Sequence, residues 1–200
     1  MKAGYVRRFS RVERLLHWVN ALGFFFLLAT GLILYLPSLS VLVSRRQFIQ
    51  EIHFWGGVSW LGALAVVLVL GLRRFARTAR EIESFDSDDL RWLRGGGKAP
   101  QGKFNAGQKI NAALTAAFTV LFGVSGLLLW FGERNTTYRF ASTVLLHDGL
   151  MYISLALLAG HLYLALIHPA TRHALRGMTL GTVSEDWARR HHSKWDAEAQ

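Results

Sequence analysis

The sequence has no cysteine and little proline. With Cys 0 and Pro 3 in 200 residues, it excludes a disulfide framework, a Cys-ligated zinc site, a c-type haem attachment and a Cys-bound iron–sulfur cluster. Proline ends or kinks helices, and here Pro37 and Pro169 fall just past the ends of apolar runs. Those runs are therefore predicted to form uninterrupted helices.

Acidic residues are also scarce. The chain carries Asp+Glu 13 against Lys+Arg 23, a formal net charge of +10 at pH 7. In a soluble protein this balance would suggest a nucleic-acid partner. Here the basic residues lie between long apolar runs, and 52% of the chain is hydrophobic before glycine is counted. Membrane lipid rather than nucleic acid is therefore the expected partner, and intrinsic disorder is excluded.

Four apolar stretches are long enough to cross a bilayer, since a spanning helix needs about 20 mainly apolar residues. The stretches cover residues 15–36, 52–72, 110–131 and 144–168. They predict an all-α integral membrane protein, a four-transmembrane-helix up-down bundle that forms a single domain over residues 1–200. A charged loop over 73–109, with glycines at 95–97 as its flexible part, and a tail over 169–200 complete the chain.

The basic residues also predict the orientation of the helices. Five precede the first stretch, nine lie in the 73–109 loop and five in the tail, whereas four lie at the other ends of the stretches. Because segments rich in Lys and Arg stay in the cytoplasm, we expect the N-terminus, the C-terminus, the loop and the tail to be cytoplasmic.

Four histidines stand out, because ionisable side chains are rare inside a bilayer. They are His17 in the first stretch, His53 in the second, and His147 and His161 in the fourth. The last two are separated by almost four helical turns, so they share one face at opposite depths. In an up-down bundle, His17 then pairs with His161 near the inner surface, and His53 pairs with His147 near the outer surface. Two bis-His b haems need two such pairs.

Other interpretations of the histidines remain open. A histidine at the end of a membrane helix can be an interfacial side chain, and His161 could instead form a hydrogen bond between helices. His168, further along the same stretch, could replace His161 as a ligand. The tail histidines, His173, His191 and His192, are expected at the surface. Zinc fits less well, because its ligands must converge on one point.

Glycines lie close to these histidines. Gly56 and Gly57 lie in the turn after His53, Gly149 follows the first histidine of the fourth stretch, and Gly160 precedes the second. A bare backbone would let a bulky macrocycle approach, although small residues equally serve plain helix–helix contacts.

Several motifs lie near these histidines and at helix ends: RLLHW at 14–18, HFWG at 53–56, FNAGQK at 104–109, HD at 147–148 and GH at 160–161. A tail follows, with GMTLGTVSEDWA at 177–188, then His191, His192 and Trp195. Over almost the whole chain, this set resembles the gamma subunit (cytochrome b556) of membrane-bound, quinone-linked formate dehydrogenases. The tail favours this family over the cytochrome b subunits of nickel–iron hydrogenases and thiosulfate reductases.

The resemblance implies a subunit of an oxidoreductase in the bacterial cytoplasmic membrane, with no catalytic residue of its own. A molybdenum- or tungsten-containing alpha subunit would oxidise formate outside that membrane, and an iron–sulfur beta subunit with one anchor helix would pass the electrons on. His53 and His147 would hold the iron of the outer of two b haems, and His17 and His161 that of the inner one.

The resemblance further implies that menaquinone or ubiquinone is reduced near the cytoplasmic face. The family's quinone pocket maps onto Asn105, Gly107 and the ligand His161, with Gln108 and Lys109 as additions. The Asn105 amide can bond a quinone carbonyl, and Gly107 permits close backbone approach. The same residues also suit a plain helix N-terminus with Asn105 as its cap.

Two other functions stay open. The chain could be the cytochrome b subunit of a nickel–iron hydrogenase or thiosulfate reductase with the same four ligands. It could also be a haem-free membrane anchor or transporter bundle whose histidines bind substrate or relay protons. Arg8, Arg11 and Arg14 could pair with haem propionates, or could serve only the charge bias that orients the helices.

Overall fold

The computed structural model describes residues 4–43, 45–95 and 98–196. Lys2, one of the basic residues before the first stretch, and the glycines at 96 and 97 lie outside the described residues. The chain divides into two compact units, which are described separately. Unit 1 comprises Met1–Arg14, Gly71–Ala117 and Ala156–Gln200, and unit 2 comprises Leu15–Leu70 and Phe118–Leu155.

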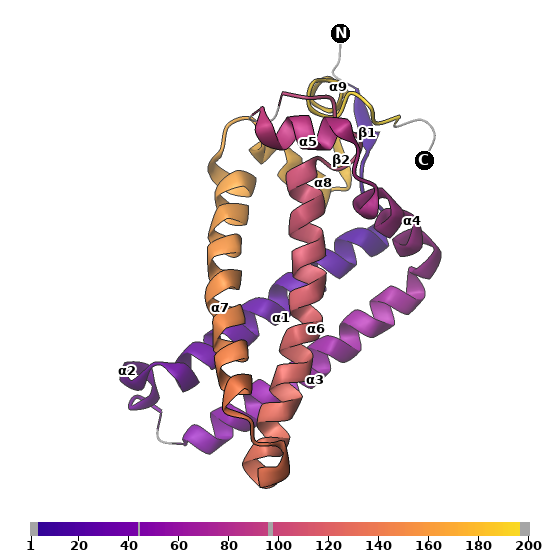
Figure 1. The fold of residues 1–200 in the computed structure, drawn as a ribbon. Helices are drawn as coiled ribbons and strands as arrows, with labels where there is room; N and C mark the ends of the chain where they lie inside the picture. The colour runs from indigo at the N-terminus through magenta and orange to yellow at the C-terminus, as the bar shows by residue number, and fades with distance from the viewer. Residues whose placement is uncertain (1–3, 44, 96–97, 197–200) are drawn as a thin grey trace. The chain divides into compact units, whose positions relative to one another are not determined.

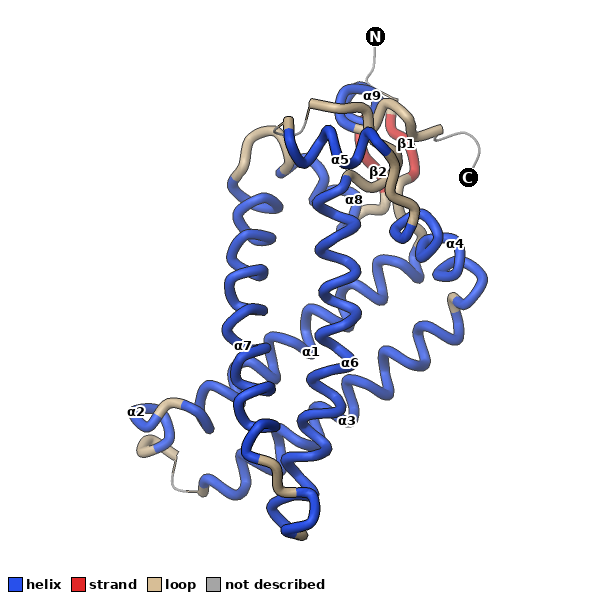
Figure 2. The backbone as a smooth tube through the Cα atoms, viewed as in Figure 1, coloured by secondary structure: helices blue, strands red, loops and turns tan. Residues whose placement is uncertain are grey.

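Four long apolar helices confirm the predicted architecture of an all-helical membrane protein (Figure 1, Figure 2). They are α1 (Arg11–Tyr35), α3 (Arg46–Leu70), α6 (Ala106–Arg134) and α7 (Ala141–Leu162). Among the described residues, these four helices are long and apolar enough to cross a membrane, and a π-helical turn, η2 (Tyr163–Ile167), extends α7. Each helix begins before its predicted stretch, because the first helical turn contains polar residues that lie outside the apolar run.

In unit 2, α1 and α3 pack antiparallel at glycines. A Cβ atom on Gly23 would lie 2.1 Å from Cδ1 of Trp60, and one on Gly56 would lie 2.4 Å from Cε1 of Phe26. From Gly23 to Phe26 the residue number increases along α1, whereas that of the contacting residue in α3 decreases from Trp60 to Gly56. This order shows that the two helices are antiparallel. The bare backbone of α1 therefore holds the buried Trp60 ring. A short helix, α2 (Pro37–Ser40), lies between α1 and α3 in the sequence.

Aromatic side chains connect the other helices of unit 2. Phe54 of α3 stacks on Trp130 of α6, with ring centroids 3.8 Å apart and planes 5° apart. The Tyr152 hydroxyl of α7 donates to the Tyr35 hydroxyl of α1 at 2.7 Å. The 3-10 turn η1 (Thr136–Tyr138) lies between α6 and α7 in the sequence. Each of the four long helices thus contributes side chains to this unit.

Unit 1 contains a small sheet that the sequence pattern did not predict. Strand β1 (Tyr5–Arg7) pairs antiparallel with β2 (Thr182–Ser184), with Val6 opposite Val183. Val183 is buried and packs against Trp187. The rest of the tail forms η3 (Arg172–Ala174), α8 (Leu175–Thr179) and α9 (Glu185–His191). The tail is therefore folded onto the N-terminal segment.

The 73–109 segment, predicted to be a charged loop, is largely helical in its described part. Helix α4 (Leu72–Glu83) follows directly after α3, and α5 (Ser87–Arg94) comes next. The Asp86 carboxylate caps α5, and the Asp89 carboxylate accepts in return from the Asp86 backbone N–H at 3.0 Å. Such a reciprocal cap satisfies amides that have no partner inside the helix.

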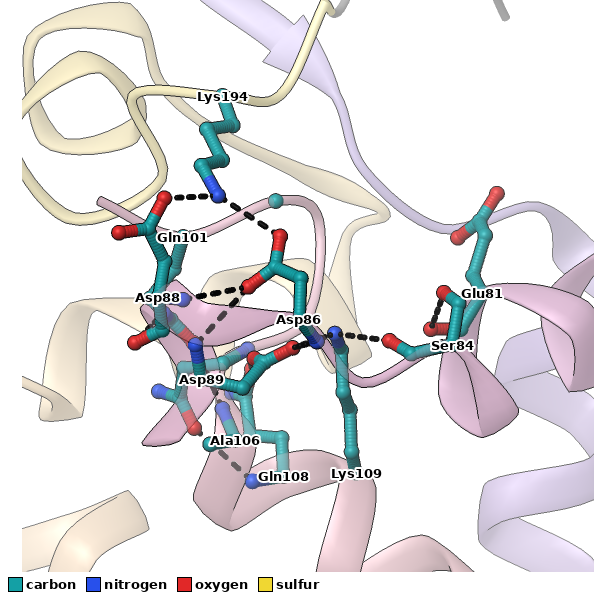
Figure 3. A network of polar contacts seen from close by, with 12 residues as sticks. Glu81, Ser84, Asp86, Asp88, Asp89, Gln101, Ala106, Gln108, Lys109 and Lys194 are labelled. Atoms are coloured by element: carbon teal, nitrogen blue, oxygen red, sulfur yellow. Dashed lines mark hydrogen bonds and ion pairs between the residues drawn. The ribbon is translucent and has the colours of Figure 1, made fainter. Parts of the chain in front are cut away.

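Lysines fasten α5 to its neighbours, as Figure 3 shows. Lys109 Nζ, in the first turn of α6, donates to Asp89 Oδ2 at 2.7 Å and to the Ser84 carbonyl at 2.8 Å. Lys194 of the tail donates to Asp86 Oδ2 at 2.8 Å. This hydrogen bond and those from the first amides of α5 lower the pKa of Asp86 to about 2. The carboxylate is therefore ionised throughout the physiological pH range.

The surroundings of Gly23 in α1 and Gly62 in α3 predict two opposite effects of adding a methyl group. In Gly23→Ala, the new Cβ collides with the Trp60 ring, and overpacking of this kind costs about 1–3 kcal/mol. In Gly62→Ala, the new Cβ meets no described atom within 4 Å, and alanine favours a helix over glycine by roughly 1 kcal/mol. We expect the melting temperature of the detergent-solubilised protein to fall in the first variant only. Equal melting temperatures would contradict the packing of α1 on α3.

Candidate functional site

Two histidines from different helices face each other in unit 2. The rings of His53 in α3 and His147 in α7 have centroids 6.3 Å apart, and their planes are inclined by 75°. These are the two residues that were predicted to form the outer pair. The antiparallel order of the helices brings them to the same level although 94 positions separate them in the sequence.

Each ring is oriented by one hydroxyl group, and the two hydroxyl groups come from the other two long helices. Nδ1 of His53 lies 2.8 Å from Oγ1 of Thr30 in α1, and Nδ1 of His147 lies 2.7 Å from Oγ of Ser125 in α6. Both hydroxyls donate to a backbone carbonyl one turn earlier in their own helix. Each hydroxyl oxygen therefore accepts from the imidazole, so that Nδ1 carries the proton and Nε2 keeps its lone pair.

This arrangement suits a metal ion between the two rings. A hydrogen bond at Nδ1 fixes the tautomer and orientation of a ligating imidazole. A metal–imidazole bond is about 2 Å long, so two rings bound through Nε2 on opposite sides of one ion have centroids roughly 6 Å apart. The observed separation of 6.3 Å matches that expectation. The two imidazoles therefore fit a haem group, whose iron His53 and His147 would hold.

Two glycines border the Cε1 edges of these rings. A Cβ atom on Gly31 of α1 would lie 3.3 Å from Cε1 of His53, and one on Gly126 of α6 would lie 3.7 Å from Cε1 of His147. These positions therefore leave room for the imidazole rings where a larger side chain would press on their edges. Neither glycine was singled out from the sequence, because both lie on helices that do not carry the histidine they approach.

The glycines that the sequence did single out have other surroundings. Gly56 faces Phe26, and a Cβ on Gly57 would be in ordinary contact with Leu27 at 3.8 Å. Cβ atoms on Gly149 and Gly160 would meet nothing within 4 Å among the described residues. The alternative of plain helix–helix contact therefore holds for the two glycines that follow His53 in the sequence.

The other two predicted ligands lie in different units. His17 is in the part of α1 that belongs to unit 2, with its ring centroid 5.2 Å from that of Trp18. His161 is in the part of α7 that belongs to unit 1, two residues before the π-helical turn η2. The pairing of these two histidines therefore stays a prediction.

The alternative ligand His168 lies beyond the helix. It follows η2 with extended backbone angles, φ −63° and ψ 122°, and its Nδ1 is 3.3 Å from Oγ1 of Thr171. His168 therefore does not continue the helix that carries His161.

The residues predicted to bind quinone lie together at the beginning of α6. Oδ1 of Asn105 accepts from the backbone N–H of Gln108 at 2.9 Å, and Oε1 of Gln108 accepts from that of Asn105 at 3.1 Å. This is a reciprocal helix cap. A Cβ on Gly107 would lie 3.2 Å from the ring of Trp92. The cap interpretation is therefore confirmed for Asn105, and the quinone role stays a prediction.

Two residues of unit 1 differ from their expected surroundings. His192, expected at the surface, is only 2% exposed, because the tail folds back against the residues around Gly102. Burial, followed by the nearby Arg8 guanidinium, lowers the pKa of His192 to about 3, so its imidazole is neutral at physiological pH. Arg8 is itself 1% exposed and donates to the Lys103 carbonyl at 2.8 Å, so it is part of a buried network rather than a surface charge.

Comparison with known proteins identifies one family and several relatives, all of them cytochrome b proteins. The chain matches the model of the family described as prokaryotic cytochrome b561 over residues 8–181. It is 25% identical to the nitrate-inducible formate dehydrogenase cytochrome b556(Fdn) subunit of Escherichia coli (strain K12), over 100% of this chain and 94% of that protein. It is 24% identical to the formate dehydrogenase cytochrome b556(fdo) subunit of that strain, over 96% of this chain and 92% of that protein.

A formate dehydrogenase cytochrome b556 subunit of Haemophilus influenzae is 25% identical, over 92% of this chain and 79% of that protein. The family match contains the histidine pair, its hydroxyl partners and all four long helices. The chain therefore belongs to the prokaryotic cytochrome b561 family, whose members bind haem.

Proposed function

We propose that this chain is the cytochrome b subunit of a membrane-bound formate dehydrogenase, which carries electrons across the membrane to quinone. The observation that carries the proposal is the pair of His53 and His147, with both Nδ1 atoms hydrogen-bonded and both Nε2 atoms available for one iron. A haem bound there would supply one-electron chemistry in the apolar interior of the bundle. The relatives named as formate dehydrogenase subunits support the choice of electron donor.

A second b haem would be held by His17 and His161. His161 shares α7 with His147, and the two are separated by almost four turns. The π-helical turn η2 directly after this part of α7 supports a functional role there, because π-helical turns occur frequently at functional sites. Two ligand pairs at different depths would divide the transfer across the bilayer into two shorter steps.

Quinone reduction is assigned to the beginning of α6. Within unit 1, α6 begins and α7 ends on the same side (Figure 1), which supports grouping Asn105 with His161. The cap uses the Asn105 oxygen and leaves the amide NH2 to donate to a quinone carbonyl. The Gly107 backbone N–H belongs to the first helical turn, where amides lack acceptors within the helix. Gln108 holds Asn105 in place from the other side of the cap.

The surrounding complex follows from this role. An iron–sulfur subunit with an anchor helix would deliver electrons to the His53–His147 end, and a molybdenum- or tungsten-containing subunit would oxidise formate. The excess of Lys and Arg supports an orientation with both termini in the cytoplasm. Menaquinone or ubiquinone would then take up protons on the cytoplasmic side of a bacterial inner membrane. Electrons moving inward and protons consumed inside would together build a transmembrane potential.

Loss of one ligand tests the histidine pair. In His53→Ala, we expect the dithionite-reduced complex to retain about half of its low-spin b-type absorbance, because one of two haems loses an axial ligand. His173→Ala, which changes an exposed histidine of the tail, should leave the spectrum unchanged and serves as the control. Full absorbance in the His53 variant would exclude the pair as a haem site.

The hydrogen bond between His147 Nδ1 and Ser125 should change the midpoint potential of the haem without being required for haem binding. In Ser125→Ala, Nδ1 loses its acceptor and the imidazole becomes a weaker electron donor to iron. We expect an unchanged haem content and a more positive midpoint potential for one haem, measured by redox titration of the visible spectrum. Thr179→Ala is the control, since this exposed hydroxyl also bonds a backbone carbonyl of its own helix, α8. Equal potentials in Ser125→Ala and the unmodified complex would contradict the tautomer assigned here.

Two substitutions of Asn105 separate its cap role from its quinone role. Ser preserves an N-cap and Ala does not, at a cost of about 1 kcal/mol in helix stability. If the amide binds quinone, both Asn105→Ala and Asn105→Ser raise the KM for quinone about tenfold, the effect of losing one good hydrogen bond, while the haem spectrum stays normal. Normal kinetics in Asn105→Ser would show that the cap is the whole role of this residue.

A further inference from the structure

A buried arginine lies next to the predicted quinone site, and its side-chain partners among the described residues are all neutral. The Arg8 guanidinium is packed near the rings of Phe9 and Trp187, at 5.2 Å and 5.1 Å from their centroids. Burial lowers its pKa to about 10, so it stays charged at physiological pH. No carboxylate in the described part of the chain pairs with Arg8, and burying a charge without such a partner is costly. Packing of the tail alone does not explain a charged residue at this position.

The Arg8 guanidinium links three segments that are distant in the sequence. Its Nη2 donates to the Lys103 carbonyl at 2.8 Å and to Oε1 of Gln108 at 3.3 Å, and lies 3.0 Å from Nε2 of His192. One nitrogen thus touches the segment before α6, the helix cap itself and the C-terminal tail. Arginine suits this position because its planar donors have a fixed geometry.

His192 is the anchor of this network in the tail. Its Nδ1 lies 2.6 Å from the Gly102 carbonyl, which can only accept. Nδ1 therefore carries the proton, and Nε2 accepts from Arg8. Both nitrogens of the neutral ring are engaged, so the position of the guanidinium depends on the tail remaining folded at this point.

Gln108 connects Arg8 to Asn105 by hydrogen bonds. Its Oε1 accepts from Arg8 and also from the Asn105 backbone N–H at 3.1 Å. With that oxygen held from two directions, the Gln108 side chain has one orientation, and the cap that fixes the Asn105 carboxamide is held with it. A hydrogen-bonded series thus runs from His192 through Arg8 and Gln108 to Asn105.

We propose that Arg8 and His192 are positioning residues for quinone, and that the C-terminal tail sets the geometry of the quinone site through them. The inference rests on the proposed function, because it takes Asn105 as the group that binds the quinone. It gives the folded tail a role in substrate affinity in addition to its packing against the N-terminal strand. A residue that only held the tail in place would not change the KM for quinone in a complex that is otherwise intact.

Three variants of the complete complex test the proposal, with formate as donor and a short-chain naphthoquinone as acceptor. Arg8→Lys keeps the charge and loses the planar donors, and His192→Leu keeps the bulk and loses both hydrogen bonds. We expect each to raise the KM for the quinone about tenfold, with kcat within about twofold, the effect of a displaced hydrogen-bond donor. His192→Gln has one donor and one acceptor, so it should restore most of the affinity. Arg189→Ala, which changes an exposed residue of α9, is the control.

The visible spectrum and the subunit composition of each variant are recorded with the kinetics. Unchanged KM values in Arg8→Lys and His192→Leu overturn the proposal, and the proposed function survives if Asn105→Ala still raises KM. An unchanged KM in Asn105→Ala overturns both. Loss of haem or of subunits in Arg8→Lys and His192→Leu, with no rescue by His192→Gln, also overturns the proposal, since the network would then be purely structural.

Discussion

A polar group inside a bilayer has no water to bond, so it must find its partner within the protein. Thr30 and Ser125 satisfy this condition twice over, since each hydroxyl donates to its own helix and accepts from a histidine of another helix. The constraint fixes which nitrogen of each ring is protonated. It thereby leaves a lone pair on each Nε2 atom, and four helices contribute side chains to this pair.

The four long apolar helices among the described residues, and the proximity of His53 to His147, could be predicted from the sequence. Length and apolar content are local properties, and the up-down order then places His53 and His147 at one level. The rotation of each helix about its axis could not be predicted, because it depends on contacts between helices. For that reason the residues that approach the rings, such as Thr30 and Gly31, were found only in the structure, and so was the contact of Gly56 with Phe26.

The residues of unit 1 were harder to predict, for a different physical reason. Strands β1 and β2 are each three residues long, which is too short for an alternating pattern to be recognised. The two strands also pair with each other from distant parts of the sequence. His192 was expected at the surface because the tail is charged, yet its burial depends on a carbonyl at Gly102 and on Arg8. The composition of the tail describes that segment alone, whereas the burial of its residues depends on the other segments that it packs against.

A helix cap and a ligand site need not compete for the same residue. The cap at the beginning of α6 requires an acceptor, which the Asn105 oxygen supplies, whereas a quinone carbonyl requires a donor, which the amide nitrogen of the same side chain can supply. The cap therefore fixes the orientation of the Asn105 side chain through its oxygen alone. An asparagine carries an acceptor and a donor on one planar amide, so it can cap a helix and bind a ligand at the same time. A substitution that preserves only the acceptor separates the capping role from the binding role.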